Sequence, residues 1–401
     1  MLRSVSFAIF CLYFTCNGFG QKILMHRSKA VHSQKDVIDI LHEIIPHKKS
    51  DIEFESGHAS KNHWAIVPAA GYTLQTRGAI VLSSIYEHDG RDAETTSSTV
   101  TSSLSYTQNK QVIWVAQSNL WSSKNKYNFL ADDRYMNYPT SVYGLGPNSV
   151  YGTKEDVTYH YIKLHHTILK NLSPMLYAGI GYYLDYYWNI KELNVPDQTI
   201  SSFQQYGFNR HEIASGLNFQ SIYDSRDNTV NPTKGAYASI RYRPNVKWLG
   251  SSSHWSQSII ELKKYYQFPA FTNNILGLWS YNAFTLSGKP PYLQLPSTGW
   301  DDFFNTGRGY IQGRYRGNNM MYVESEYRFG LTRNGLIGAV VFGNIQTFSD
   351  QLKNQFNKLI PGYGTGIRIK MNKYSRSNLG LDFAWGADHS RGLFVNLGEV
   401  F

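Results

Sequence analysis

The chain has 401 residues, a formal net charge of +10 and only two cysteines. Charged residues make up 17% of it and aromatic residues 15%, and no clustered stripe of Lys and Arg favours nucleic acid as a partner. Both cysteines, Cys11 and Cys16, lie in a predicted signal peptide. The mature chain is therefore expected to lack disulfide frameworks, thiolate metal sites and cysteine nucleophiles.

Residues 1–20 predict a secretory signal peptide. Arg3 supplies the positive start, Val5 to Phe14 form a short apolar core, and turn-like residues lead to a cleavage site near Gly20. A lipoprotein signal ending at Cys16 is the weaker alternative, because large residues precede it. The rest of the chain contains no apolar run of about 18 residues, so no transmembrane helix is expected. A soluble all-β protein and a transmembrane β-barrel both fit this composition.

Residues 21–62 predict an N-terminal periplasmic segment with one short amphipathic helix at 35–45. Apolar residues recur on one helical face from Val37 to Ile45, and Pro46 ends the run. Packing of this helix against the main domain is the ordinary interpretation. A membrane-surface helix, or a site for a periplasmic partner or client protein, is the alternative.

From residue 63 to residue 401 the hydrophobic pattern has a period of two, which predicts strands. In 176–188 the even positions are apolar or aromatic, whereas the odd positions include Gly179, Gly181 and Asp185. Such segments run about ten residues or more, which suits a tilted transmembrane strand better than the shorter strands of a soluble sandwich. Aromatic residues at the segment ends, such as Tyr186 and Trp188, fit an interfacial girdle.

Sixteen alternating segments predict an all-β fold, a sixteen-stranded antiparallel transmembrane barrel that must close because lipid cannot satisfy an open strand edge. Their approximate centres are residues 67, 82, 102, 115, 128, 164, 181, 216, 240, 260, 280, 323, 340, 367, 381 and 396. Short connections such as Asn334-Gly335 alternate with long ones near 134–156, 189–208, 289–316 and 346–361. An even strand number places both barrel ends on the periplasmic side of a Gram-negative outer membrane, among its lipids and lipopolysaccharide.

The stretch "GRGYIQGRYRGNNMMYVESEYRF", residues 307–329, joins a basic, glycine-rich loop to a strictly alternating strand. The alternation predicts that Glu324, Glu326 and Arg328 face the lumen together with Tyr322, while Met321 and Val323 face lipid. We expect the preceding loop to fold into the barrel, because arginine can bind an inward carboxylate through two parallel hydrogen bonds.

This stretch resembles the BamA/TamA-like superfamily of outer-membrane assembly and translocation barrels, also called the bacterial surface antigen family. Arg308, Gly309 and Tyr310 match its [VL]-R-G-[FY] motif, which sits on the lumenal loop between strands eleven and twelve. The resemblance implies a loop motif with partners on the barrel wall. The motif residues would be Arg308, Gly309, Tyr310, Gly313 and Arg314, and the wall partners Glu324, Glu326 and Asn344.

Two further segments support the resemblance. "YDSRDNTVNPTKG", residues 223–235, is similar to the family's periplasmic turn between strands eight and nine. The residues of that turn would be Asp224, Arg226, Asp227, Pro232 and Gly235. Phe401, the last residue, matches the terminal aromatic signal by which outer-membrane barrels are recognised for insertion.

Three features depart from the family pattern. Gly307 stands where the family prefers Val or Leu, and Asn344 stands where it usually has an aspartate that meets the loop arginine. About 40 residues separate the signal from the barrel, too few for a periplasmic POTRA domain, which implies the short branch without such domains.

The resemblance implies work in envelope biogenesis, either protein insertion or export, or lipid movement. A passive pore or structural barrel is the alternative, and an outer-membrane lipid hydrolase is the third hypothesis. No Gly-x-Ser-x-Gly elbow is present, and the neighbours His165 and His166 must face opposite sides of their strand. Asp224 and Asp227 lack the spacing of a standard calcium loop. No catalytic residue, metal or cofactor is therefore expected.

Overall fold

The computed structural model describes residues 34–37, 39–40, 62–88, 95–193, 200–207, 209–350, 354–373 and 375–401. The predicted signal peptide, residues 1–20, lies outside the described residues. So does most of the predicted helix at 35–45, of which Val37, Asp39 and Ile40 are described and are helical.

The described chain forms a single sheet of seventeen strands. The strands are β1 (Asn62–Thr73), β2 (Arg77–His88), β3 (Ser98–Thr107), β4 (Val112–Trp121), β5 (Tyr127–Asn137), β6 (Thr140–Val142), β7 (Glu155–Ser173), β8 (Leu176–Leu193), β9 (Glu212–Asp224), β10 (Gly235–Asn245), β11 (Trp255–Gln267), β12 (Ile275–Gly288), β13 (Asn319–Gly330), β14 (Ile337–Phe348), β15 (Ile360–Asn372), β16 (Ser377–Gly386) and β17 (Arg391–Leu397). The short helices are α4 (Ser202–Gly207) and the 3-10 turns η1 (Ser123–Asn125), η2 (Tyr151–Thr153), η3 (Lys247–Leu249) and η4 (Tyr292–Gln294).

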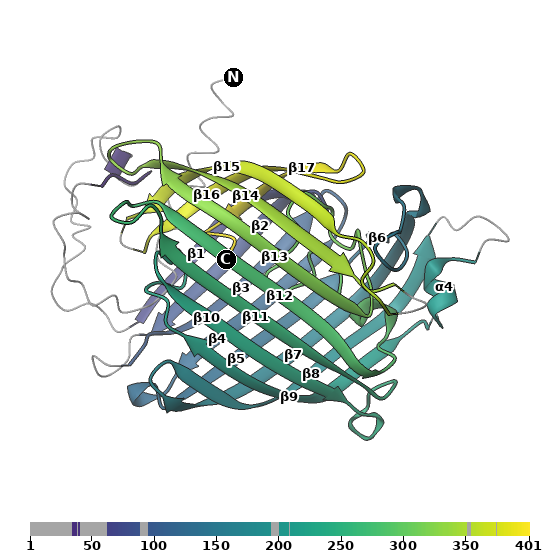
Figure 1. The fold of residues 1–401 in the computed structure, drawn as a ribbon. Coiled ribbons are helices and arrows are strands. Elements are labelled where there is room, and N and C mark those ends of the chain that lie inside the picture. The colour runs from purple at the N-terminus through teal and green to yellow at the C-terminus, as the bar shows by residue number, and fades with distance from the viewer. Residues whose placement is uncertain are drawn as a thin grey trace.

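These strands form an antiparallel barrel (Figure 1). They occupy sixteen positions around its wall, here called staves, because two of the strands share one position. β5 pairs with β7 from Asn137 to Tyr127, and the three-residue β6 pairs with the same strand beyond that point, so β5 and β6 share one stave. Every predicted segment centre falls inside a strand, one in each stave. The predicted sixteen-stranded antiparallel barrel is therefore confirmed.

Strand direction divides the connections between two ends of the barrel. The start of β1, the end of β17 and connections such as 225–234, 331–336 and 373–376 lie at one end, here called the turn end. The longer connections 138–154, 194–211, 289–318 and 349–359 lie at the other, called the loop end. β7 and β8, with 19 and 18 residues, are longer than the predicted segments and extend toward the loop end. Part of the predicted loops at 134–156 and 189–208 is therefore strand.

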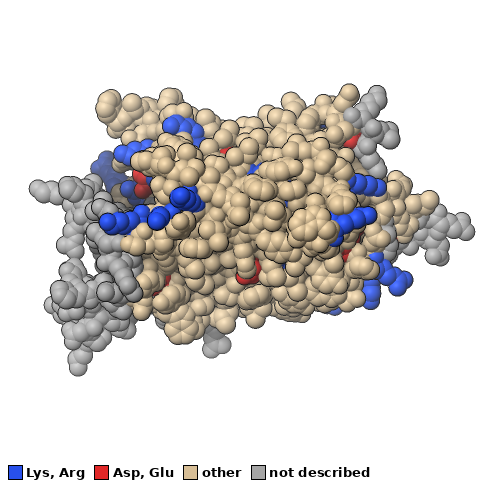
Figure 2. Space-filling model, turned by 90° about the horizontal axis from the view of Figure 1, so that it is seen from below, with Lys and Arg blue, Asp and Glu red and all other residues tan. Residues whose placement is uncertain are grey.

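The period of two places apolar side chains outside and polar ones inside. On β13, Met321 and Val323 are 41% and 54% exposed, whereas Glu324 and Glu326 are fully buried in the lumen. Figure 2 shows the result on one face, where a broad belt is nearly free of charge and Lys and Arg gather toward the two ends. Such a belt is what a strand surface in contact with lipid requires.

The two larger clusters of buried aromatic and aliphatic side chains among the described residues pack inside the barrel. One lies beneath α4 and joins Phe203 and Tyr206 to Tyr159 and Tyr292. The other joins Trp279 and Tyr322 of the wall to Tyr315 of the loop and to Phe401. The lumen therefore contains a packed core. Among the described residues, no helix is long and apolar enough to cross a membrane.

The described N-terminal segment contacts the turn end of the barrel. Lys373 Nζ lies 2.8 Å from the Asp39 carboxylate, and the Lys373 amide donates a 3.0 Å hydrogen bond to Asp36. Lys370 donates to Gln34 over 2.8 Å. These bonds attach the first described helical turn to the connection between β15 and β16.

Candidate functional site

The connection between β12 and β13, residues 289–318, enters the lumen from the loop end. It folds back on itself, with a bridge between Ser297 and Arg316 and a 3.0 Å hydrogen bond from the Thr298 amide to the Tyr315 carbonyl. Connecting loops normally run over the surface of a protein. Most residues of this one are buried, so it is part of the core.

Two glycines let the loop approach the wall. Gly309 has a φ of +107°, and a Cβ there would lie 2.7 Å from the carbonyl oxygen of Trp385 on β16. Gly307 has a φ of +77°, and a Cβ there would lie 2.5 Å from Thr298 of the same loop and 3.1 Å from Gln346 of β14. A Val or Leu at 307 would be strained in this conformation. The departure from the family pattern at Gly307 therefore has a steric reason.

The guanidinium of Arg308 is held by three carboxylates, and we call this set the latch. Its Nη2 contacts Glu324 and lies 2.5 Å from Glu326, and its Nη1 lies 2.8 Å from Asp382. Arg308 is 3% exposed and the three acids are fully buried. The Phe342 ring centre lies 3.5 Å from Arg308 Cζ, which adds a cation–π contact.

The wall acids of the latch come from strands separated in sequence. Glu324 and Glu326 are two residues apart on β13, so both face the lumen. Asp382 lies on β16, three strands further round the barrel wall. Asp382 was not among the predicted wall partners of Arg308, although the alternation of residues 378–385 places it on the polar face of its strand. That alternation was the only signal available.

A second layer of charge connects the latch to the C-terminus. Arg328 Nε lies 2.6 Å from Glu326, and Arg368 lies 2.5 Å from Asp382 and 2.7 Å from Glu399. Burial alone would lower the pKa of Arg308. The surrounding carboxylates outweigh burial and raise this pKa well above the ordinary value. The guanidinium therefore stays charged at every physiological pH.

Asn344 contacts the backbone of the loop. Its Nδ2 donates a 3.0 Å hydrogen bond to the backbone carbonyl of Arg308, not to the side chain. An asparagine amide can make this bond, whereas a carboxylate could not donate it. The residue thus positions the backbone of the loop while Asp382 supplies a charge.

The remaining motif residues attach the loop to the loop end. Tyr310 donates to the Pro361 carbonyl and accepts a 2.6 Å bond from the Ala387 amide. Arg314, 1% exposed, donates to Ser149 over 3.0 Å and lies 3.1 Å from Asp388. Gly313 has a φ of +75°, and a Cβ there would lie 3.4 Å from the Ser141 carbonyl oxygen of β6.

The turn 225–234 joins β9 to β10 at the turn end. Asp224 and Arg226 form an ion pair of 2.7 Å. Asp227 accepts from the Thr233 amide over 2.8 Å and lies 2.7 Å from Arg376 in another turn. Each bond lies within or between turns. Pro232 is buried in the same turn, and Gly235 starts β10 with a φ of +100°.

The last four residues, here called the tail, leave β17 and enter the lumen from the turn end (Figure 1). Phe401 is 5% exposed, and its ring stacks on Trp279 with centroids 5.3 Å apart. Arg328 donates to the Phe401 carbonyl over 2.8 Å, and Asn305 of the loop donates to the Val400 carbonyl over 2.8 Å. Loop and tail therefore meet inside the barrel.

The two adjacent histidines face opposite sides of β7. His165 lies in the lumen 2.9 Å from Asp185, whereas His166 lies on the outer face 2.8 Å from Asp133. Within the described ranges, no group of three or more His, Cys, Asp or Glu side chains could hold a metal ion.

Comparison with known proteins identifies the family. Residues 71–401 match the model of the Omp85 superfamily domain. The chain belongs to the Omp85 superfamily. Members of this superfamily are outer-membrane barrels. The family resemblance inferred from the motif of the lumenal loop is therefore confirmed. No curated protein sequence matches the chain.

Several solved structures share this fold at low sequence identity. BamA from Haemophilus ducreyi lacking POTRA domains 1–3 is 13% identical, with a TM-score of 0.56 over 85% of this chain and 70% of that one. CdiB from Acinetobacter baumannii is 11% identical, with a TM-score of 0.53 over 84% of this chain and 60% of that one. CdiB from Escherichia coli is 9% identical, with a TM-score of 0.54 over 84% and 63%. The chain thus spans less than two thirds of either CdiB, and the likeness concerns the fold.

Proposed function

We propose that this Omp85 barrel is an assembly or translocation factor in envelope biogenesis, and that the loop carrying Arg308 gates its lumen. Its work would be to insert or export proteins, or to move lipid. The latch is the observation that carries the proposal. Removing one partner of a buried ion pair leaves an uncompensated charge, at a cost of about 3–5 kcal/mol. The loop therefore has one well-defined closed position, and a competing partner would be needed to release it.

The seam between the first and last strands also supports an opening barrel. β16 and β17 pair over seven residues, and in the described chain no paired register joins β17 to β1, although the two strands are in contact. Leu74, which follows β1, packs against Gly392 of β17, and a Cβ built on Gly392 would lie 2.5 Å from Leu74. At this point the two strands therefore meet through side-chain packing.

The proposal also assigns surroundings and partners. The turn end would face the periplasm and the loop end the exterior, with outer-membrane lipids, including lipopolysaccharide, around the belt. The N-terminal helix would offer a periplasmic partner or client a site beside the turn between β15 and β16. Its bonds from Asp36 and Asp39 to Lys373 support that position.

A deletion strain tests the function directly. We would quantify outer-membrane and secreted proteins and, on the same cells, phospholipid exposed at the surface. Loss of a defined set of proteins would support insertion or export. An unchanged proteome with phospholipid at the surface would support lipid movement. If neither changes, the passive-pore alternative replaces this proposal.

Complementation connects the outcome to the latch. Wild type and Arg333→Ala, which alters an exposed arginine of the turn 331–336, should restore the strain. Arg308→Ala should fail to restore it, although the barrel reaches the membrane in equal amount. Full restoration by Arg308→Ala would show that the loop does not gate.

A further inference from the structure

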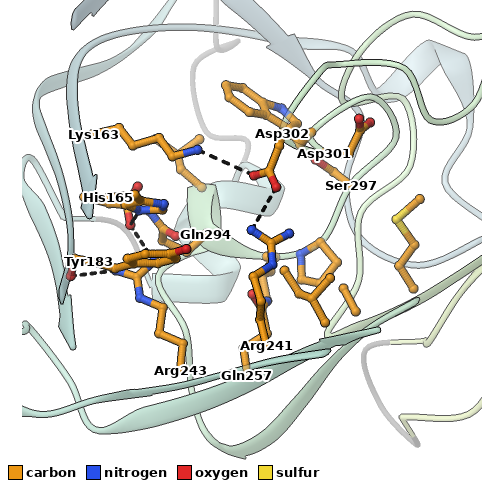
Figure 3. A pocket seen from close by; sticks show the side chains of 18 of the residues that line it. Lys163, His165, Tyr183, Arg241, Arg243, Gln257, Gln294, Ser297, Asp301 and Asp302 are labelled. Carbon is orange, nitrogen blue, oxygen red and sulfur yellow. Dashed lines mark hydrogen bonds and ion pairs between the residues drawn. The ribbon is translucent and has the colours of Figure 1, made fainter. Parts of the chain in front are cut away.

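A cavity of about 120 Å³ lies in the lumen, lined by the wall strands and the loop (Figure 3). Its lining combines cationic side chains with aromatic ones. The cations are Arg134, Lys163, Arg241 and Arg243, and the aromatic residues include Tyr161, Tyr183, Tyr281 and Trp300. None of the residues of the latch lines it. The cavity is therefore a separate feature of the lumen.

Three of these cations contact one residue of the loop, two through its carboxylate and one through its backbone carbonyl. Asp302 lies 2.8 Å from Arg241 and 3.6 Å from Lys163, as Figure 3 shows, and its carbonyl accepts a 2.6 Å hydrogen bond from Arg134. The cations come from β10, β7 and β5. Although burial alone would raise it, these charges hold the pKa of Asp302 below its ordinary value.

Asp302 differs from the other acids of this region in being carried by the loop. Asp132 lies 2.6 Å from Arg134 and 2.7 Å from Lys163, and Asp185 lies 2.5 Å from Arg243, all within the wall. The wall alone thus carries four cations against two carboxylates. Asp302 offsets one of the two positive charges that remain, and it would leave the wall if the loop moved.

The neighbouring Asp301 has another task. Its carboxylate accepts hydrogen bonds from the Asn305 amide over 2.9 Å and the Thr306 amide over 2.7 Å, so it shapes the corner of the loop. Asp302 receives no hydrogen bond of this kind in the described chain and points toward the wall (Figure 3). Asp301 therefore stabilises the corner of the loop, whereas its neighbour Asp302 attaches the loop to the wall.

From this geometry we infer that the lumenal cation cluster of Arg134, Lys163 and Arg241 is a binding site for a phosphate-type oxyanion, and that Asp302 occupies it in the empty barrel. Two arginines and a lysine from three strands surround one point, which suits an anion with several acceptor oxygens. The cavity leaves space beside that point for a compact headgroup. An incoming phosphate would replace Asp302 and free the corner of the loop that carries Trp300 and Phe304.

The test measures binding to the purified full-length barrel in a non-ionic detergent by calorimetry. The probes are inorganic phosphate, a short-chain phosphatidic acid and a short-chain diacylglycerol without phosphate. Asp302→Asn removes the competing charge and keeps the shape of the side chain. It should tighten phosphate-type binding by about tenfold or more, because a charge-assisted hydrogen bond contributes more than the free energy of a tenfold change. Lys163→Gln combined with Arg241→Gln should abolish binding.

Two controls define the outcome. Lys263→Gln alters a lumenal lysine paired with Glu261 outside the cavity and should bind as wild type does. Asp388→Asn alters another carboxylate paired with the loop and should not tighten binding.

If phosphatidic acid binds more tightly than inorganic phosphate, the ligand is a lipid headgroup, and equal affinities indicate a free phosphate ester. Asp302→Asn binding no more tightly than wild type would overturn the inference, as would binding of an acidic peptide alone. The assay measures no transport, so its failure is distinguishable from failure of the gating proposal.

Discussion

At the scale of the residue, the latch depends on the shape of Arg308 as well as its charge. One guanidinium reaches Glu324, Glu326 and Asp382 at once, because its donors form a planar fork. A lysine ammonium at the same position would keep the charge but could not span acids on two sides. We therefore expect Arg308→Lys to retain only part of the stabilisation.

Unfolding in urea, with the barrel in micelles, checks this expectation. Arg308→Ala should lower the free energy of unfolding by about 3–5 kcal/mol, because it leaves the buried Glu324 without its cationic partner. Arg308→Lys should fall between that variant and wild type. The exposed Arg333→Ala should stay within about 0.5 kcal/mol of wild type. Equal losses for Arg308→Ala and Arg333→Ala would contradict the latch.

Single-channel conductance tests whether Arg308 also keeps the loop inside the lumen. A loop released by Arg308→Ala should give larger or noisier single-channel currents than wild type in planar bilayers. Traces identical to wild type would mean that the loop stays in the lumen without its arginine, held by contacts such as those of Tyr310 and Arg314.

At the scale of the element, the tail is held at the turn end by charge and by stacking. Glu399 lies 2.7 Å from Arg368, and Phe401 packs on Trp279. Burial alone would raise the pKa of Glu399, but Arg368 and Arg328 hold it below the value of 4.5 for a free side chain. The contribution of Glu399 is therefore complete above pH 4.5 and disappears as pH falls through its lowered pKa in the folded barrel.

Glu399→Gln isolates this contribution. The urea midpoint of the variant should lie below that of wild type at pH 7, and the difference should shrink only below about pH 4.5. Carboxypeptidase should also release Phe401 at least tenfold faster from the variant, since the buried ring must leave the lumen first. The matched variant Asp388→Asn, at the loop end, should leave the release of Phe401 unchanged. A difference that persists undiminished at low pH would disprove the role of the carboxylate.

At the scale of the whole molecule, sixteen antiparallel staves place both barrel termini at one end. The proposal assigns that end to the periplasm, because short turns at one end and long loops at the other are typical of outer-membrane barrels. Both cysteines lie in the predicted signal peptide, so single-cysteine labelling needs no background substitutions.

Labelling of intact cells with a membrane-impermeant maleimide decides the orientation. Lys247→Cys, exposed at the loop end, should react. Phe271→Cys, exposed in the turn 268–274 at the turn end, should react only after the outer membrane is permeabilised. The reverse pattern would invert the proposed topology.

The alternation of side chains determined much of this protein without any tertiary information. A strand shows its two faces directly in sequence, because the period is two wherever one face meets lipid and the other a polar lumen. The barrel, its sixteen staves and the inward direction of Glu324, Glu326 and Arg328 all followed from that rule. So did the inward loop, since a basic segment next to inward carboxylates has an evident partner.

Closure of the barrel decided the rest. It brings Asp382 of β16 to Arg308, Asp302 of the loop to Arg241 and Phe401 to Trp279, and no local pattern links these residues. The partner of Asn344 was also not predictable from the sequence. Only the path of the loop determines whether its amide meets a guanidinium or a backbone carbonyl. Strand periodicity specifies which face a side chain occupies. The curvature of the sheet, and the points where the loop and tail fold back, determine which residue lies opposite that side chain in the lumen.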